Sequence, residues 1–243
     1  MKAIAWLIVL LCTVNAFTAS VNYPDHWWTP VTDKVVPTWE ILPQAASKDK
    51  NEVIISKRNE LGLLSNFSAT PFTMLKTDYA SLEGLWQSMK LPENEKDQRM
   101  KLSQAWVNKR EDVEKLTAFE ALKAGKAAEA IMKEKGITWV SFRGHKIEYK
   151  GKHADAYYEI IEAATRAKID QNPKVKEVLL KTGTLTLRPD HHEDKDGTKA
   201  WKYYDIYMKL RAELKDHPNK KLYNEDWYKH FAKRYKLSSA FAK

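Results

Sequence analysis

The single cysteine constrains this chain most, because a chain with one cysteine cannot form an internal disulfide. Cys12 lies in the apolar stretch 3–14, which follows a basic start and precedes small residues. This pattern is typical of a secretion signal, and Val14, Asn15 and Ala16 fit the cleavage rule best. We expect a signal peptide over residues 1–16, with cleavage between residues 16 and 20. The mature protein is then secreted or periplasmic, and a retained N-terminal anchor is the alternative.

Removal of that segment leaves no cysteine, although small exported proteins commonly rely on disulfides. The stability of the mature protein must therefore come from its hydrophobic core. A cysteine nucleophile and a cysteine-ligated metal are excluded for the mature form. The apolar stretch is short for a bilayer-spanning helix, and no later segment is apolar enough, so we expect no membrane span after cleavage.

Composition indicates a globular protein. Hydrophobic residues make up 43% of the 243 residues and charged residues 30%, a balance that differs from that of disordered chains. The formal net charge is +9, which favours association with polyanions. The charges alternate in sign along predicted helices, a pattern typical of solvated helix faces. Polyanion binding at the cell surface therefore remains a hypothesis that rests on charge alone.

The chain divides into an arm, one domain and an extension. Residues 17–50 are rich in proline and tryptophan, and the spacing of their prolines excludes a continuous helix. Residues 51–216 have the patterns of a mainly α domain with minor β, a single helical domain with short strands. Residues 217–243 are predicted to form a C-terminal helical extension.

The hydrophobic periodicity and the capping, proline and glycine residues locate the helices and strands. Ser81 is a good helix N-cap, and Pro92 ends the helix that it starts. Pro173 opens a later helix, and Gly183 is suited to end it. We predict helices over residues 81–91, 95–108, 112–135, 153–171, 173–182, 199–216 and 224–236. We predict strands over 53–56 and 184–187, and a hairpin over 137–149 that turns at Arg143 and Gly144.

Several familiar site motifs are absent from the sequence. Residues 192–197 place a glycine at the sixth position of a calcium loop, but His192 replaces its first Asp and Tyr203 its final Glu. His191 and His192 are adjacent, which is not the spacing of two zinc ligands on one helix face. No phosphate-binding or dinucleotide-binding glycine loop occurs. We therefore expect neither a metal nor a cofactor.

Two segments interrupt apolar patterns with polar residues. The first holds Asn66, between apolar neighbours, and Glu83, in the first turn of an apolar helix on the same face as Gln87 and Lys90. A first-turn glutamate also complements the helix dipole, so a purely structural role for Glu83 stays open. The second segment, 168–211, would be a helix end, a strand and a solvated loop if it had no binding role.

Together these segments resemble the NADAR (YbiA-like) N-glycosidase family. The segment LSNF at 64–67, the pattern S-L-E-x-x-x-Q-x-x-K at 81–90, and A-K-I-x-Q-N-P-x-V-K-x-x-L-L-x-T-G at 167–183 match in order and spacing. The similarity covers residues 53–212. In place of a W-G-x-G segment found in many members, this chain has Pro189, Asp190 and His191, followed by Ala200 and Trp201. The chain thus resembles a secreted variant with a YbiA-like helical domain.

The resemblance implies hydrolysis of the bond between ribose and a nitrogenous base. The family's central glutamate falls on Glu83, the asparagine of LSNF on Asn66, and the lysine before Q-N-P on Lys168, while Trp139 matches a tryptophan of the family. Glu83 would stabilise oxocarbenium charge and activate water. Asp190 is our candidate for the second catalytic group.

The other candidate residues follow from their chemistry. Arg58 and Lys168 are suited to phosphate, and His191 lies beside Asp190. Trp86, Trp139 and Trp201 would stack on a base, although core packing is the alternative for each.

The leading hypothesis is an N-glycosidase, a hydrolase that acts on an ADP-ribosylated nucleobase or a phosphoribosyl base, either as a small molecule or attached to nucleic acid. The alternative is a non-catalytic module that is exported from the cell and binds ADP-ribose or a nucleotide. The sequence does not indicate an oligomeric state.

Overall fold

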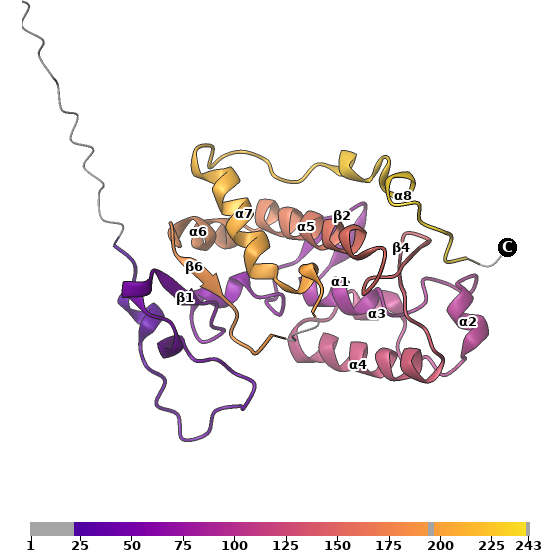
Figure 1. Ribbon diagram of the computed structural model, residues 1–243, viewed down its shortest axis with the longest axis horizontal. Helices are drawn as coiled ribbons and strands as arrows, with labels where there is room; N and C mark the ends of the chain where they lie inside the picture. The colour runs from indigo at the N-terminus through magenta and orange to yellow at the C-terminus, as the bar shows by residue number, and fades with distance from the viewer. Residues whose placement is uncertain (1–21, 194–196, 242–243) are drawn as a thin grey trace, which may run out of the picture.

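The computed structural model describes residues 22–193 and 197–241 (Figure 1). Within these residues, eight α-helices and three two-stranded sheets give a mainly α structure with minor β, as the sequence predicts. The predicted signal peptide lies outside the described residues. In the described ranges, no helix combines the length and the hydropathy needed to cross a bilayer.

The elements run in this order along the chain. The helices are α1 (Leu82–Ser88), α2 (Gln98–Leu102), α3 (Arg110–Val113), α4 (Ala118–Glu134), α5 (Ala154–Gln171), α6 (Pro173–Lys181), α7 (Tyr203–Lys215) and α8 (Phe231–Arg234). The strands are β1 (Glu52–Ile54), β2 (Phe72–Met74), β3 (Thr77–Tyr79), β4 (Val140–Phe142), β5 (His145–Ile147) and β6 (Thr186–Arg188). Short 3-10 turns lie between several of them.

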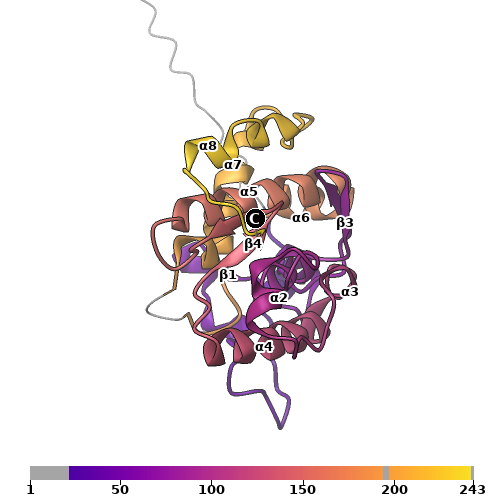
Figure 2. The ribbon, with the colours of Figure 1, turned by 90° about the vertical axis from the view of Figure 1, so that its right-hand side faces the viewer.

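Helix α5 is the centre of the molecule. In Figure 1, α4 lies along one edge, α5 runs through the middle, and the C-terminal segment crosses the opposite edge. Helix α5 contacts α1, α6, α7 and β2. Its buried Ala156, Ala163, Ala164 and Ala167 allow these neighbours to approach closely. The view in Figure 2 shows α4 and the C-terminal segment on opposite sides of this core.

The parallel sheet β1–β6 brings two distant segments together. Val53 is opposite Leu187 in its register, and both are buried. Because the strands are parallel, their carboxyl ends lie at the same edge. Lys57, just beyond β1, therefore comes beside Asp190, just beyond β6.

The sequence predicts the turn of one of the two hairpins but not that of the other. Arg143 and Gly144, the predicted turn of β4–β5, both have positive φ, as a two-residue hairpin turn requires. The hairpin β2–β3 turns at Leu75 and Lys76, which also have positive φ. Neither is a usual residue for that conformation. The hydroxyl of Tyr223 accepts a hydrogen bond from the Leu75 amide. A tertiary contact therefore holds this turn, which has no turn-forming residues in its local sequence.

The predicted helix over 112–135 is interrupted between α3 and α4. The carbonyls of Glu114 and Leu116 accept hydrogen bonds from the Ala80 amide and the Ser81 hydroxyl. These carbonyls therefore bond to the start of α1 rather than continuing a helix. A β-carbon on Gly84 would come within 2.7 Å of the Leu116 carbonyl oxygen, so this approach requires glycine.

Other predicted helices are shorter than expected. The helix expected over 95–108 is α2 alone, which begins after Asp97 as its N-cap. The helix expected over 224–236 is two short turns, Glu225–Tyr228 and α8. The C-terminal segment instead gains its order from contacts, because Asp170 on α5 accepts from the backbone amides of residues 222 and 223.

Candidate active site

The start of α1 positions Glu83. The Ser81 hydroxyl accepts from the Gly84 amide at 2.9 Å, the bond that an N-cap serine makes. The Glu83 amide donates to the Asn66 carbonyl oxygen at 3.0 Å. The loop containing LSNF is thereby joined to the first turn of the helix. Two segments that resemble the family thus meet at one point.

The Glu83 side chain lies in a protein interior with polar neighbours. The residue is only 6% exposed, and its Oε1 accepts from the Gln87 side-chain amide at 2.6 Å. Burial raises its pKa, and the hydrogen bond from Gln87 and the charges of Lys90, His191 and Lys57 partly offset that rise. Glu83 therefore takes up a proton more readily than an ordinary glutamate.

Asp190 has the opposite electrostatic environment. It is fully buried, and burial alone would raise its pKa. The hydrogen bond from His191 (Nδ1 to Oδ1, 3.3 Å) and the ion pair with Lys57 outweigh burial, so its pKa is lowered. Asp190 is thus the carboxylate that stays ionised.

The two carboxylates share neighbours. Lys57 and His191, the partners of Asp190, also act on the pKa of Glu83. The buried Tyr203 has a strongly raised pKa, caused by burial and by the charges of Asp190 and Glu83 among others. We call Glu83, Asp190, Lys57 and His191 the carboxylate cluster.

This arrangement separates the roles of two acids. When environments push the pKa values of two titratable groups apart, one serves as a proton carrier and the other as a fixed charge. In the carboxylate cluster, Glu83 is suited to take a proton. Asp190 is suited to hold Lys57 and His191 in place.

Two buried amide oxygens lie beside Glu83. The Oδ1 of Asn66 and the Oε1 of Gln87 have no hydrogen-bond partner among the described residues. Buried acceptors without partners are uncommon in proteins. The Asn66 oxygen could accept from a hydroxyl group of a bound ligand, a role that a ribose hydroxyl would satisfy, whereas the Gln87 oxygen packs against Gly125 of α4.

Arg58 is not free to bind phosphate in this structure. Its guanidinium makes a bidentate contact with Glu40, at 2.7 and 2.8 Å, and also contacts Asp33. These partners raise its pKa. Two carboxylates of the arm thus hold the arginine in this structure, and the phosphate contact expected of Arg58 stays a prediction.

Lys168 has a supporting position rather than a direct one. It is fully buried, and its ammonium donates at 2.8 Å to the Ser65 carbonyl and to the Ser68 hydroxyl. Burial lowers its pKa well below the ordinary value. Lys168 thus holds the loop that carries Asn66, and the phosphate contact expected of it stays a prediction.

The three tryptophans have different positions. Trp86 packs edge-on against Tyr157, whose ring is buried beside Glu83. Trp201 faces Lys150 at 5.3 Å, and its indole nitrogen is buried without a partner among the described residues. Trp139 instead stacks on Arg99 at 4.6 Å. No described contact connects Trp139 to the carboxylate cluster.

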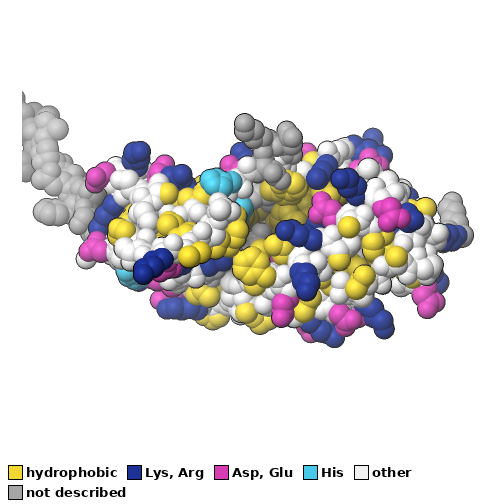
Figure 3. Space-filling view, turned by 90° about the horizontal axis from the view of Figure 1, so that it is seen from below, with side chains coloured by type: hydrophobic (Ala, Val, Ile, Leu, Met, Phe, Trp, Pro, Cys, Tyr) yellow, Lys and Arg dark blue, Asp and Glu magenta, His cyan; other side chains and the backbone are white. Residues whose placement is uncertain are grey.

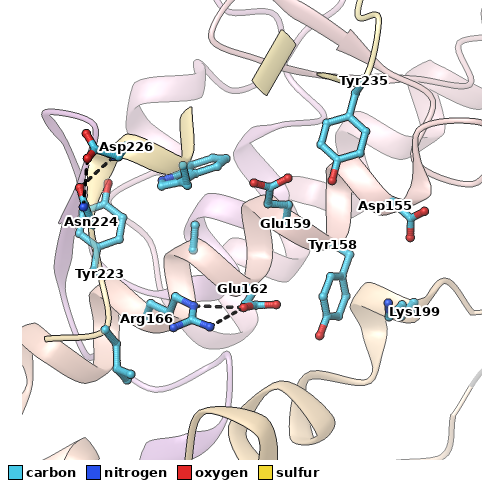
Figure 4. A pocket seen from close by; sticks show the side chains of 13 residues that line it. Asp155, Tyr158, Glu159, Glu162, Arg166, Lys199, Tyr223, Asn224, Asp226 and Tyr235 are labelled. Atoms are coloured by element: carbon cyan, nitrogen blue, oxygen red, sulfur yellow. Dashed lines mark hydrogen bonds and ion pairs between the residues drawn. The ribbon is translucent and has the colours of Figure 1, made fainter. Parts of the chain in front are cut away.

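Two cavities of the described residues lie away from the cluster. One, of about 700 Å³, lies between α5 and the C-terminal segment (Figure 4). Its Glu162 is paired with Arg166, as the figure shows. The other, of about 180 Å³, lies beside Arg110 and Arg143. We assign the site from the cluster of ionisable groups rather than from cavity size, because opposed pKa shifts mark chemistry and volume alone does not.

The sequence-based prediction places Gln87 on the helix face of Glu83 without giving it a role, and it omits Lys57 from the site residues. Lys57 precedes Arg58, and its importance depends on the β1–β6 pairing, which no local pattern reveals. Gln87 lies four residues after Glu83, the spacing that places two side chains on one helix face. That spacing was the available signal. Within the described ranges, no group of three His, Cys, Asp or Glu side chains could hold a metal.

Comparisons with known proteins add one similar structure. No family model and no curated protein matches the chain. The NMR structure of the E. coli protein YbiA is similar, with a TM-score of 0.40 and 18% sequence identity over 68% of this chain and 86% of that one. Function is therefore argued from the site residues themselves.

Proposed function

We propose that this chain is a hydrolase of ribosyl N-glycosidic bonds, with Glu83 as its catalytic base. The observation that carries the proposal is the buried Glu83 carboxylate at the start of α1, held by Gln87 and close to a second buried carboxylate, Asp190, which is paired with Lys57 and His191. The resemblance of the Glu83 and Asn66 segments to the NADAR family supports the same chemistry.

The proposed reaction needs no group beyond the side chains and water. The bond between the ribose anomeric carbon and the base nitrogen breaks, and its electron pair leaves with the base. Positive charge develops on the sugar, where the Glu83 carboxylate stabilises it. A water oxygen then bonds to the anomeric carbon while Glu83 accepts a proton from that water. The departing base takes up a proton from solvent.

The remaining groups of the site would bind and orient the substrate. Asn66 would accept a hydrogen bond from a ribose hydroxyl through the oxygen that lacks a partner among the described residues, and the Gln87 side-chain amide would orient Glu83. Asp190 would hold the Lys57 ammonium in position at the edge of the site. The substrate class is a ribosyl or ADP-ribosyl base, free or attached to nucleic acid, and the predicted signal peptide supports action outside the cytoplasm.

The test is release of free base. Wild-type protein and Glu83→Gln are incubated with ADP-ribosylated guanine nucleoside, phosphoribosyl-aminopyrimidine and NAD, and the products are read by mass spectrometry. We expect release from one of these substrates by the wild type and a loss of at least about 100-fold in the variant, the usual effect of removing a general base.

A matched variant controls for folding. Glu159→Gln removes a half-buried glutamate that is paired with Arg234, away from the carboxylate cluster, and should release base at the wild-type rate. If wild-type protein releases no base but binds ADP-ribose, the non-catalytic binding module is the correct assignment. Binding that weakens steeply with salt and ignores Glu83 would instead indicate polyanion binding.

A further inference from the structure

Three aromatic side chains from distant segments meet near the carboxylate cluster. Trp39 of the arm packs edge-on against Phe119 of α4, with ring centroids 5.9 Å apart. Phe119 packs in the same way against Phe67, at 5.2 Å. We call these three side chains the aromatic ledge.

The aromatic ledge is open to solvent where core aromatics are not. Trp39 is 39% exposed and Phe119 is 55% exposed, whereas most large apolar side chains of the described residues are buried. Exposed apolar surface that is contiguous can mark a ligand-binding site. Figure 3 shows hydrophobic side chains gathered near the middle of the face seen from below, beside Lys, Arg and His side chains.

Lys57 connects the ledge to the carboxylate cluster. Its ammonium lies 5.3 Å from the Trp39 ring and 5.1 Å from the Phe67 ring. The same ammonium pairs with Asp190. An ammonium has three N–H donors, so the bond to Asp190 leaves donors that can face a ligand lying on the rings.

The arm is fastened at this point. Ile41 donates its amide to the Asp190 carbonyl at 2.8 Å, and Glu40 forms a β-bridge with His191. The bidentate contact of Glu40 with Arg58 adds a charged anchor. Trp39, the residue before Glu40, is therefore held beside the site by three separate contacts, which explains why two carboxylates of the arm occupy Arg58.

We propose that the aromatic ledge is the subsite for the planar base of the substrate. The base lies against Trp39 and Phe119, and Lys57 donates a hydrogen bond to a ring nitrogen or carbonyl oxygen of that base. Lysine makes this contact with purine edges, and aromatic rings stack with any nucleobase. The inference rests on the proposed function, because it takes the ribose to lie at Glu83. It assigns the arm a direct part in recognition.

The test compares ligands with and without a base. Binding of guanosine 5′-monophosphate, adenosine 5′-monophosphate and ribose 5-phosphate to the full chain is measured by calorimetry. We expect Trp39→Ala and Phe119→Ala each to weaken binding of the two nucleotides by about tenfold, the scale of losing one stacking contact. Binding of ribose 5-phosphate should not change. Val35→Ala, a change at an 86% exposed residue of the same arm, should leave all three affinities unchanged.

The outcomes separate this inference from the proposed function. The base subsite is wrongly assigned if both variants keep the wild-type affinity for the nucleotides. It is also wrong if they lose affinity for ribose 5-phosphate to the same extent, or if the wild type binds neither nucleotide. Glu83→Gln should keep the nucleotide affinity while turnover disappears. If the wild type releases no base but Trp39→Ala weakens nucleotide binding, the proposed catalysis is wrong and the assignment of the aromatic ledge as the base subsite still holds.

Discussion

The two ends of α1 both hold buried charges, but they differ in how completely those charges are paired. At the end of the helix, Arg99 is fully buried and donates to the carbonyls of residues 89, 90 and 91 and to both oxygens of Asp97. All five of its N–H groups have partners. At the start of the helix, Glu83 has one amide donor, and its neighbours Asn66 and Gln87 each keep an oxygen that no described residue contacts by a hydrogen bond.

This difference indicates a structural role for the cluster at the end of α1 and a ligand-binding role for the cluster at its start. A saturated buried cluster caps the orphan carbonyls of a helix end and fixes a fold. Such a cluster has no hydrogen-bond donor or acceptor left for a ligand. An unsaturated cluster costs stability and is retained where something must bind. Trp139 belongs to the saturated end, through its stacking on Arg99, so no described contact with the carboxylate cluster supports its predicted role in substrate binding.

The largest expected effect lies at the saturated end. Arg99→Leu leaves Asp97 buried without its ion-pair partner and removes the donor to the Lys90 carbonyl. The carbonyls of Met89 and Leu91 keep the Ser141 amide and Arg110 as donors. Breaking a buried pair in this way costs about 3 to 5 kcal/mol. We expect the free energy of unfolding, measured in urea, to fall by that amount. Turnover per folded molecule should stay near the wild-type value, and a specific loss of turnover would remove the distinction between the two ends.

The next largest effect is expected from a substitution that displaces Gln87, beside Glu83 at the start of α1. A β-carbon on Gly125 of α4 would collide with Gln87 Oε1 and lie 2.8 Å from its Cβ, so Gly125→Ala should displace Gln87. Glu83 then loses a hydrogen bond that lowers its pKa. We expect the acid limb of the pH–rate profile to move to higher pH. We also expect kcat/KM at neutral pH to fall about tenfold, or about 1.4 kcal/mol.

Gly151→Ala is the matched control for that change. A β-carbon on Gly151 would meet only ordinary contacts, at 3.7 Å and beyond. Both the pH–rate profile and kcat/KM should match those of the wild type. A Gly125→Ala protein with an unmoved acid limb would show that Gln87 does not position Glu83.

The smallest effect is on stability, and its sign depends on pH. Burial raises the folded-state pKa of Glu83 above its ordinary value of 4.5. The stability that neutral Glu83 gives is complete below the ordinary value and is lost as pH rises through the folded value. The glutamine of Glu83→Gln cannot ionise, so we expect this variant to be more stable than wild type at neutral pH. Denaturant midpoints at pH 4 and pH 7 check this, and equal differences at both would contradict it.

The sequence predicted the parts that depend on local chemistry. Ser81 as N-cap, Pro173 at a helix start and the turn at Arg143 and Gly144 are all residues whose own geometry favours the observed structure. The turn at Leu75 was not predictable, because a hydroxyl 148 positions away in sequence holds it. The break before α4 was hidden for the same reason.

The candidate site shows the same division. Glu83 and Asn66 stand out in sequence because polar residues interrupt apolar segments. The pairing of Lys57 with Asp190, and the occupation of Arg58 by Glu40, depend on strand register and on the fastening of the arm. Burial of Lys168 depends on packing around α5. These three facts decide which cations face a ligand, and none has a local signature.

The parallel pairing of β1 with β6 also sets an order in time. Lys57 and Asp190 are 133 positions apart, and a growing chain presents the first long before the second. The nascent protein can form α1, α4 and α5 from local contacts while β1 still waits for its partner. Long-range pairing of this kind is slow to form. The helical framework can therefore form before the site, which is complete only once β6 has paired with β1.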